Sequence, residues 1–258
     1  MDTSKRHRAL EQAKRLSILI WRGLNQLLWP AACGVCNEAI CDTDNDLCPK
    51  CWNELLTCTA GDYCPRCGRD ASRYGLVGGA CGACRNEDIH FDGIARVGVY
   101  ADALQRMILA FKHDRSELAV ALAPLAAAAL QGSSFGDDID LLVPVPLHWT
   151  RRLLRGYNQS HLIAKRLHRP HARVSRDLVR ARRTRTQPQV ATPAARARNV
   201  AGAFLVRDGH DFSGKTICLV DDIKTSGATL NECAKTLKEA GAVKVYALVL
   251  AVAGQRPV

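Results

Sequence analysis

The stretch Thr216-Ile-Cys-Leu-Val-Asp-Asp-Ile-Lys-Thr-Ser-Gly-Ala-Thr-Leu230 is the most informative part of this chain for the fold. Its first residues are apolar and predict a buried strand, and Leu230–Ala240 has the pattern of a helix. Two adjacent carboxylates, Asp221 and Asp222, lie between them. A strand, a polar loop and a helix in this order are typical of an α/β domain.

The loop that follows the acid pair has the composition of a phosphate-binding loop and consists of Thr225, Ser226, Gly227, Ala228 and Thr229. A helix N-terminus offers free N–H groups and partial positive charge, glycine permits close approach, and hydroxyls add donors. The two carboxylates would repel a phosphate. They are therefore predicted to engage a sugar diol, directly or through Mg²⁺, which prefers oxygen ligands. Together these groups would hold a ribose 5-phosphate.

The arrangement resembles the 5-phosphoribosyl-1-pyrophosphate (PRPP) signature of type I phosphoribosyltransferases. The chain has neither the Gly-x-x-x-x-Gly-Lys-Ser/Thr of a P-loop nor a dinucleotide-binding fingerprint after a strand. The alternative is that Asp221 and Asp222 only end a strand and begin a turn.

The length of 258 residues, with 47% hydrophobic and 24% charged residues, is that of an ordinary globular protein of one or two domains. Leu16–Trp21 is apolar but bracketed by Arg15 and Arg22, so neither a signal peptide nor a membrane span is expected. Residues 5–29 instead predict an amphipathic helix packed on its own domain, with a membrane-surface role as the alternative. We expect a cytoplasmic protein.

Ten of the twelve cysteines fall between Cys33 and Cys84. Eight of them form four Cys-x-x-Cys knuckles: Cys33 and Cys36, Cys48 and Cys51, Cys64 and Cys67, Cys81 and Cys84. Two knuckles complete a tetrahedral site for structural Zn²⁺, so two zinc sites are predicted. The hairpin-length inserts favour sequential zinc ribbons over a cross-braced pairing, and an iron–sulfur cluster is the alternative metal. Cys41 and Cys58 are expected to be spare thiols.

After the knuckles, strands alternate with helices, which predicts an α/β domain with a mainly parallel sheet. The predicted strands are 94–100, 141–145, 217–220 and 243–252, with a short strand at 200–206 returning to the sheet. The predicted helices are 104–111, 117–130, 158–167 and 230–240. The predicted domains are the helix of residues 1–30, the double zinc ribbon of residues 31–89 and the α/β domain of residues 90–258.

Ligands of such sheets bind beyond the carboxyl ends of the strands, so the loop after 141–145 should lie beside the acid pair. It is predicted to be a basic loop that binds pyrophosphate through Arg155, Gly156, Tyr157 and Asn158. The excursion of residues 182–199, which includes Arg196, is predicted to be a lid over the site. The alternative is a solvated basic loop without a ligand.

Residues 151–207 contain fourteen arginines and one lysine against one acid, Asp177, a net charge of +14, while the whole chain carries +11. This segment should attract polyanions such as single-stranded DNA. Aromatic residues near it are few, so electrostatic attraction would dominate any binding.

Taken together, these features resemble the ComF family, in which a double zinc ribbon is fused to a phosphoribosyltransferase-like domain. The resemblance also covers Trp29-Pro30, Phe111-Lys112-His113, Val143–Pro146 and Arg196–Asn199. It implies that Asp221 and Asp222 engage the ribose or its Mg²⁺, that residues 225–229 hold the 5′-phosphate, and that residues 155–158 hold the pyrophosphate. It also implies a link to DNA uptake or utilisation, with other competence proteins as partners.

Two departures limit what the resemblance implies. Purine salvage enzymes carry a third acid three residues after the second, and Thr225 occupies that position here. No glutamine-hydrolysing domain is expected before the sheet. Three functions stay open: transfer of phosphoribose from PRPP to an unidentified acceptor, a non-catalytic competence factor that binds single-stranded DNA on residues 151–207, and a structural adaptor.

Overall fold

The computed structural model describes residues 11, 17, 32–40, 46–113, 115–167, 171–182 and 192–254. The chain divides into two compact units, Met1–Trp52 and Asn53–Val258. The first cysteine quartet lies in the first unit and the second quartet lies in the second unit, with the α/β sheet. The predicted domain limits after residues 30 and 89 stay predictions.

The N-terminal segment is described only at Glu11 and Ser17, which are both helical; the rest of the predicted helix 5–29 lies outside the described residues, as does Cys41. Within the described ranges, no helix has both the length and the apolar character needed to cross a membrane.

The central sheet has five strands, and every neighbouring pair is parallel, which confirms the predicted architecture. Its strands, in spatial order, are β3 (Gly93–Val99), β9 (Lys244–Val252), β8 (Thr216–Lys224), β4 (Leu141–Pro144) and β5 (Arg173–Val174). Strand β5 was not predicted, because its two residues lie in the basic segment without an apolar pattern of their own.

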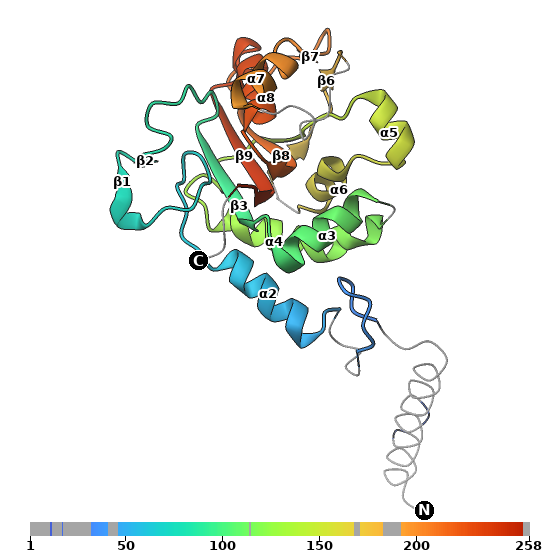
Figure 1. Ribbon diagram of the computed structural model, residues 1–258. Coiled ribbons are helices and arrows are strands. Elements are labelled where there is room, and N and C mark those ends of the chain that lie inside the picture. Colours follow the sequence, from blue (N-terminus) through green and yellow to red (C-terminus); the bar gives the residue numbers. More distant parts are fainter. Residues whose placement is uncertain are drawn as a thin grey trace, which may run out of the picture. The chain divides into compact units, whose positions relative to one another are not determined.

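Helices cover both faces of this sheet (Figure 1), which is why its central strands are almost wholly apolar. One face carries α4 (Ala119–Gln131) and α6 (Gln159–Arg166), and the other carries α8 (Ala228–Glu239). Leu230, Cys233, Ala234 and Leu237 of α8 pack on β8 and β9 in the main core cluster. Helix α3 (Asp102–Lys112) follows β3.

Strands β6 (Leu178–Arg180) and β7 (Phe204–Val206) form a separate two-stranded antiparallel sheet. The prediction that residues 200–206 return to the main sheet is therefore wrong. Phe204 of β7 is buried in the main core cluster, and the Arg180 guanidinium lies 5.1 Å from the centre of its ring.

The predicted lid, residues 182–199, contains helix α7 (Pro193–Val200), which the Thr192 side chain caps. Residues 183–191 of the lid lie outside the described residues.

The segment predicted as a basic loop after β4 contains a seven-residue helix, α5 (Trp149–Arg155). The His148 ring accepts a hydrogen bond from the Thr150 amide at its start, and Gly156, with φ of 73°, ends it in the left-handed conformation. Helix α2 (Pro49–Thr59) begins inside the second knuckle and was not predicted either. The shorter elements are η1 (Arg73–Gly75), β1 (Leu76–Val77), β2 (Ala80–Cys81) and η2 (Ser116–Leu118).

Candidate functional site

The acid pair lies inside strand β8 rather than after it. The sequence predicts a strand ending at Val220, but pairing with β9 continues to Lys224. On the other side, β4 is parallel to β8, and the Val145 amide donates to the Val220 carbonyl at 2.9 Å. The loop after β4 and the acid pair therefore start at the same edge of the sheet, as the sequence predicts.

Asp221 is half-buried beside α6. Its Oδ1 accepts hydrogen bonds from the Asp222 amide at 2.9 Å and from the Ser160 hydroxyl at 3.2 Å. Burial, together with the negative charge of Asp222, raises the pKa of Asp221 to about 7, although the Asp222 amide, Lys112 and Ser160 act in the opposite direction. One nearby cation, Lys112, does not balance two adjacent carboxylates, and a bound cation or sugar diol would fit the pair.

Asp222 has a cationic partner, Lys112, the last residue of α3. The Lys112 ammonium lies 2.9 Å from Asp222 Oδ2, and both side chains are less than one-fifth exposed. Tyr157 fixes this end of α3 as well, because its hydroxyl donates to the Phe111 carbonyl at 2.6 Å.

The predicted phosphate loop turns directly into α8, which begins at Ala228 and not at Leu230. Gly227 precedes the helix with φ of 83°, and no side chain from that position caps it. The Ala228 amide has a long contact of 3.4 Å to the Ser226 hydroxyl. Thr225 is exposed, and Thr229 lies in the first helical turn. The helix N-terminus is therefore poorly capped and suited to an anion.

Three of the four residues predicted to bind pyrophosphate after β4 lie at a cavity of about 290 Å³. Gly156, Tyr157 and Asn158 line it, and Asn158 also donates to the Val145 carbonyl at 3.1 Å. Four arginines line the same cavity: Arg152, Arg176, Arg180 and Arg207. The described residues of its wall include no carboxylate.

Two predicted arginines lie outside that wall. Arg155 directs its guanidinium to the Gln159 side chain at 3.4 Å. Arg196 lies half-buried on α7.

The eight knuckle cysteines form two sequential quartets, so the cross-braced alternative is wrong. In each quartet the four Sγ atoms lie within 4.8 Å of one another. Four pairs of Sγ atoms within the quartets lie 3.6–3.7 Å apart. A Zn–S bond of about 2.3 Å in a tetrahedron requires a separation of about 3.8 Å. The donor set and its spacing therefore fit zinc.

Backbone amides support the thiolate form in both quartets. The Cys48 amide donates to Cys33 Sγ and the Cys81 amide to Cys64 Sγ, each at 3.3 Å. Although burial raises the pKa of Cys33, hydrogen bonds from the amides of Cys36, Cys48 and Val35 lower it to about 6. The predicted spare thiol Cys58 lies outside both quartets and is buried against the Ala101 carbonyl.

Two separate segments of the chain match two domain families. Residues 24–85 match the double zinc ribbon domain, and residues 155–258 match the phosphoribosyl transferase domain. Competence protein F of Haemophilus influenzae is 30% identical over 178 residues, which cover 66% of this chain and 77% of that protein. DNA utilization protein YhgH of Escherichia coli O6:H1 is 31% identical over 219 residues, covering 83% of this chain and 86% of that protein. The chain belongs to the ComF family.

A shorter match supports the same family. Competence protein ComFC of Bacillus subtilis is 33% identical over 107 residues, 42% of each chain. A purine phosphoribosyltransferase from Pyrococcus horikoshii covers 53% of this chain and 78% of its own, at 15% identity and a TM-score of 0.28, too low to support any argument.

In this ComF-family protein, sequence reasoning found the acid pair and both loops but missed their supports. The sequence places Lys112 in Phe111-Lys112-His113 without predicting a role for it, and it predicts none for Ser160. Their places beside the acid pair depend on the packing of α3 and α6 against the sheet, which no local pattern reports.

Proposed function

We propose that this ComF-family protein binds PRPP and transfers its phosphoribosyl group to an acceptor. The observation that carries the proposal is the position of the acid pair, with the phosphate loop after it on β8 and an arginine-lined cavity beyond the neighbouring strand β4. A molecule with a phosphate at one end, a diol in the middle and a diphosphate at the other suits this order.

Each group of the site has a task in the transfer. Asp221 and Asp222 would hold the ribose hydroxyls, directly or through Mg²⁺, whose charge would offset that of the leaving diphosphate. The arginines of the 290 Å³ cavity would stabilise the negative charge that develops as the bond from C1 to the diphosphate oxygen breaks. Lys112 would hold Asp222 in place. The acceptor then forms the new bond at C1, and pyrophosphate leaves.

Calorimetric titration with PRPP tests this proposal. Wild type should bind only when Mg²⁺ is present, and Asp221→Asn with Asp222→Asn should abolish binding while the protein keeps its melting temperature. Since the pKa of Asp221 is raised to about 7 and the cation needs the ionised form, affinity should increase between pH 6 and pH 8, by up to about tenfold per unit below that pKa.

A matched control is Asp211→Asn, because Asp211 caps an exposed turn through Ser213 before the amino end of β8, whereas the acid pair lies toward the carboxyl end of that strand. This variant should bind PRPP as wild type does. No calorimetric signal for wild type up to millimolar PRPP would refute the proposal.

A second candidate function is binding of single-stranded DNA. The observation that favours it is Trp149, which is 64% exposed on α5 and lines the arginine cavity together with Arg152. Bases stack on such an aromatic ring while neighbouring arginines contact the backbone. The other predicted contacts are Arg151, Arg173, Arg180, Arg182 and Arg183, the last of which lies outside the described residues.

Fluorescence anisotropy with a labelled oligonucleotide tests the DNA function. With four to six phosphate contacts, the log–log slope of affinity against salt should be about −3 to −4. Trp149→Ala should weaken binding about tenfold, whereas Trp52→Ala, which removes another exposed tryptophan outside the basic segment, should not change it. If Trp149→Ala and Trp52→Ala bind the oligonucleotide equally well, or if affinity does not change with salt, the DNA-binding function is refuted and only the enzyme function remains.

A further inference from the structure

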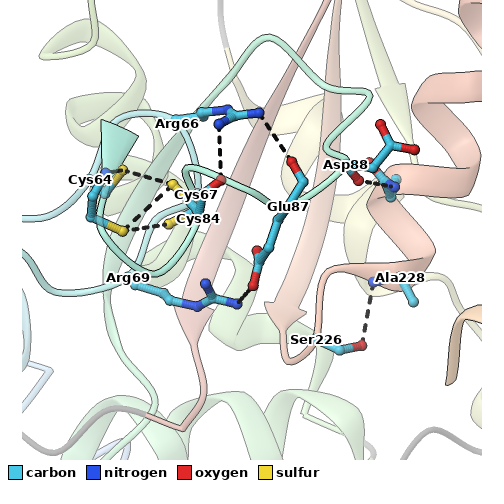
Figure 2. Close-up of polar contacts among 11 residues, drawn as sticks. Cys64, Arg66, Cys67, Arg69, Cys84, Glu87, Asp88, Ser226 and Ala228 are labelled. Carbon is cyan, nitrogen blue, oxygen red and sulfur yellow. Dashed lines mark hydrogen bonds and ion pairs between the residues drawn. The ribbon is translucent and has the colours of Figure 1, made fainter. Parts of the chain in front are cut away.

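A cavity of about 310 Å³ lies between the phosphate loop and the second zinc ribbon. Ser226, Gly227 and Ala228 line one side of it, and Arg69 and Glu87 of the ribbon region line the other. Figure 2 shows the Arg69–Glu87 pair between the second cysteine quartet and the loop that carries Ser226. The roles assigned so far to the ribbon are structural, and none of them explains a cavity at this place.

Lys224 supplies a buried positive charge to this cavity. Its residue is only 4% exposed, and its Nζ lies 3.6 Å from the position a Cβ atom would take on Gly227. Its ammonium makes no hydrogen bond or ion pair with any residue that the structure describes. Glu87 and the zinc-site thiols of Cys67 and Cys84 are near enough to act on it, but none of the three forms a hydrogen bond or ion pair with it, and Glu87 is already paired with Arg69 at 2.8 Å. A buried ammonium without a partner is unfavourable, so this one points to a bound anion.

Arg69 reaches the cavity from the zinc knuckle itself. Its carbonyl accepts from the Cys64 amide at 2.8 Å, so the metal site holds its backbone. A guanidinium carries five donors, and one contact to Glu87 leaves others for an oxyanion. Asp88 also lines the cavity, but its side chain is 88% exposed and points away from Ser226 and Ala228 (Figure 2).

We infer that this cavity is a phosphomonoester site shared by the two parts of the fold, in which Lys224 from β8 and Arg69 from the second zinc ribbon bind the phosphate that the N-terminus of α8 receives. The inference rests on the proposed function, since the phosphate would be the 5′-phosphate of PRPP. It makes the second zinc ribbon part of the ligand site: without zinc, Arg69 loses its anchor.

Titration calorimetry with ribose 5-phosphate, ribose and inorganic phosphate tests the site without PRPP or Mg²⁺. Ribose 5-phosphate should bind to wild type and ribose should not. Inorganic phosphate alone should compete with ribose 5-phosphate. Lys224→Met and Arg69→Gln should each weaken ribose 5-phosphate binding about tenfold or more, as loss of a charged hydrogen bond requires.

Two matched controls keep the cavity intact. Lys235→Met removes an exposed lysine of α8, and Arg73→Gln removes an exposed arginine of the same ribbon, paired with Asp62. Both should bind ribose 5-phosphate as wild type does. The melting temperature of ligand-free Lys224→Met should equal or exceed that of wild type, because a side chain kept for the ligand contributes nothing to stability.

The outcomes separate the two proposals. If Lys224→Met and Arg69→Gln bind ribose 5-phosphate within twofold of wild type, or if wild type binds neither it nor inorganic phosphate at 10 mM, the shared site is overturned. The proposal that the protein binds PRPP is then tested separately by Asp221→Asn with Asp222→Asn. If ribose 5-phosphate binds through Lys224 but PRPP with Mg²⁺ does not bind, the shared site stands and the proposed function fails.

Discussion

The two zinc ribbons repeat one knuckle in two different settings. The amides of Cys33 and Cys64 each donate at 2.8 Å to the carbonyl five residues later, and the carbonyls of both cysteines accept from the fourth residue after them. That fourth residue is Asn37 in one ribbon and Gly68 in the other, and both have positive φ. The metal sites are built alike.

Their surroundings differ. The first quartet belongs to the unit of residues 1–52, whereas the second shares a unit with the sheet. There, the Pro65 carbonyl accepts from the Ile94 amide of β3 at 2.8 Å, and a Cβ on Gly68 would lie 3.2 Å from Val252 of β9. The same zinc chemistry thus supports a separate small unit in one case and a wall of the α/β domain in the other.

The largest difference between the two ribbons is expected when Cys33→Ser is compared with Cys64→Ser. Elemental analysis should find about two zinc ions per wild-type chain and one in each variant. Because metal binding supplies the folding energy of a ribbon, Cys64→Ser should lower the melting temperature of the α/β domain by about 10 °C or more. Cys33→Ser should leave that transition in place in scanning calorimetry. An equal fall in both variants would show that the ribbons are not energetically separate.

A smaller effect is expected at Arg96, which joins the second ribbon to β3. Its buried guanidinium donates to the Gly68 carbonyl at 2.7 Å, forms an ion pair with Asp70 and lies 4.8 Å from the centre of the Tyr63 ring. Arg96→Met removes the buried ion pair with Asp70 and the hydrogen bond to Gly68, and should cost about 3 kcal/mol in urea denaturation.

The matched change to Arg96→Met is Arg73→Met, in the same ribbon. Arg73 forms an exposed pair with Asp62 and has no contact of this kind to the sheet among the described residues. The change in the free energy of unfolding caused by Arg73→Met should stay within experimental error. If the two variants prove equally stable, the second ribbon is attached by something other than Arg96.

The smallest expected difference in stability is between Gly68→Ala and Asn37→Ala. Gly68→Ala forces a left-handed alanine with its Cβ 3.2–3.3 Å from Val252 and Ile94, and should cost about 2 kcal/mol in thermal unfolding of the α/β domain. Asn37→Ala meets the backbone penalty alone, about 1 kcal/mol, and should weaken zinc retention by the first ribbon in a chelator competition. A Gly68→Ala protein as stable as wild type would contradict the close packing of the second ribbon on the sheet.

Much of this fold followed from local patterns, because the buried parallel strands β3, β4, β8 and β9 are apolar runs and the knuckles have fixed spacing. The end of β8 was missed because Asp221 and Asp222 are poor strand formers. Pairing of Asp221 with Val249 and of Lys224 with Val252 outweighs that preference. Tertiary contacts also decided β7, which pairs with β6 and not with the main sheet.

The candidate site divides in the same way. Residues consecutive in sequence, such as the acid pair and the phosphate loop, were predicted together. Lys112, Ser160 and Arg69 come from distant segments, and only the packing of α3, α6 and the second ribbon brings them there. Lys224 belongs to the same consecutive stretch, but its burial beside Gly227 depends on the fold and not on the local pattern.

The extension of β8 through the acid pair has a dynamic consequence. Asp221 and Ile223 pair with β9, and the Ala253 amide donates to the Lys224 carbonyl at 2.8 Å, so the backbone that carries both carboxylates is held by interstrand hydrogen bonds. Such amides exchange slowly with solvent, whereas those of an ordinary binding loop exchange fast. On the proposed function, the backbone that carries the carboxylates is therefore ordered before PRPP binds, and little backbone entropy is lost in aligning them.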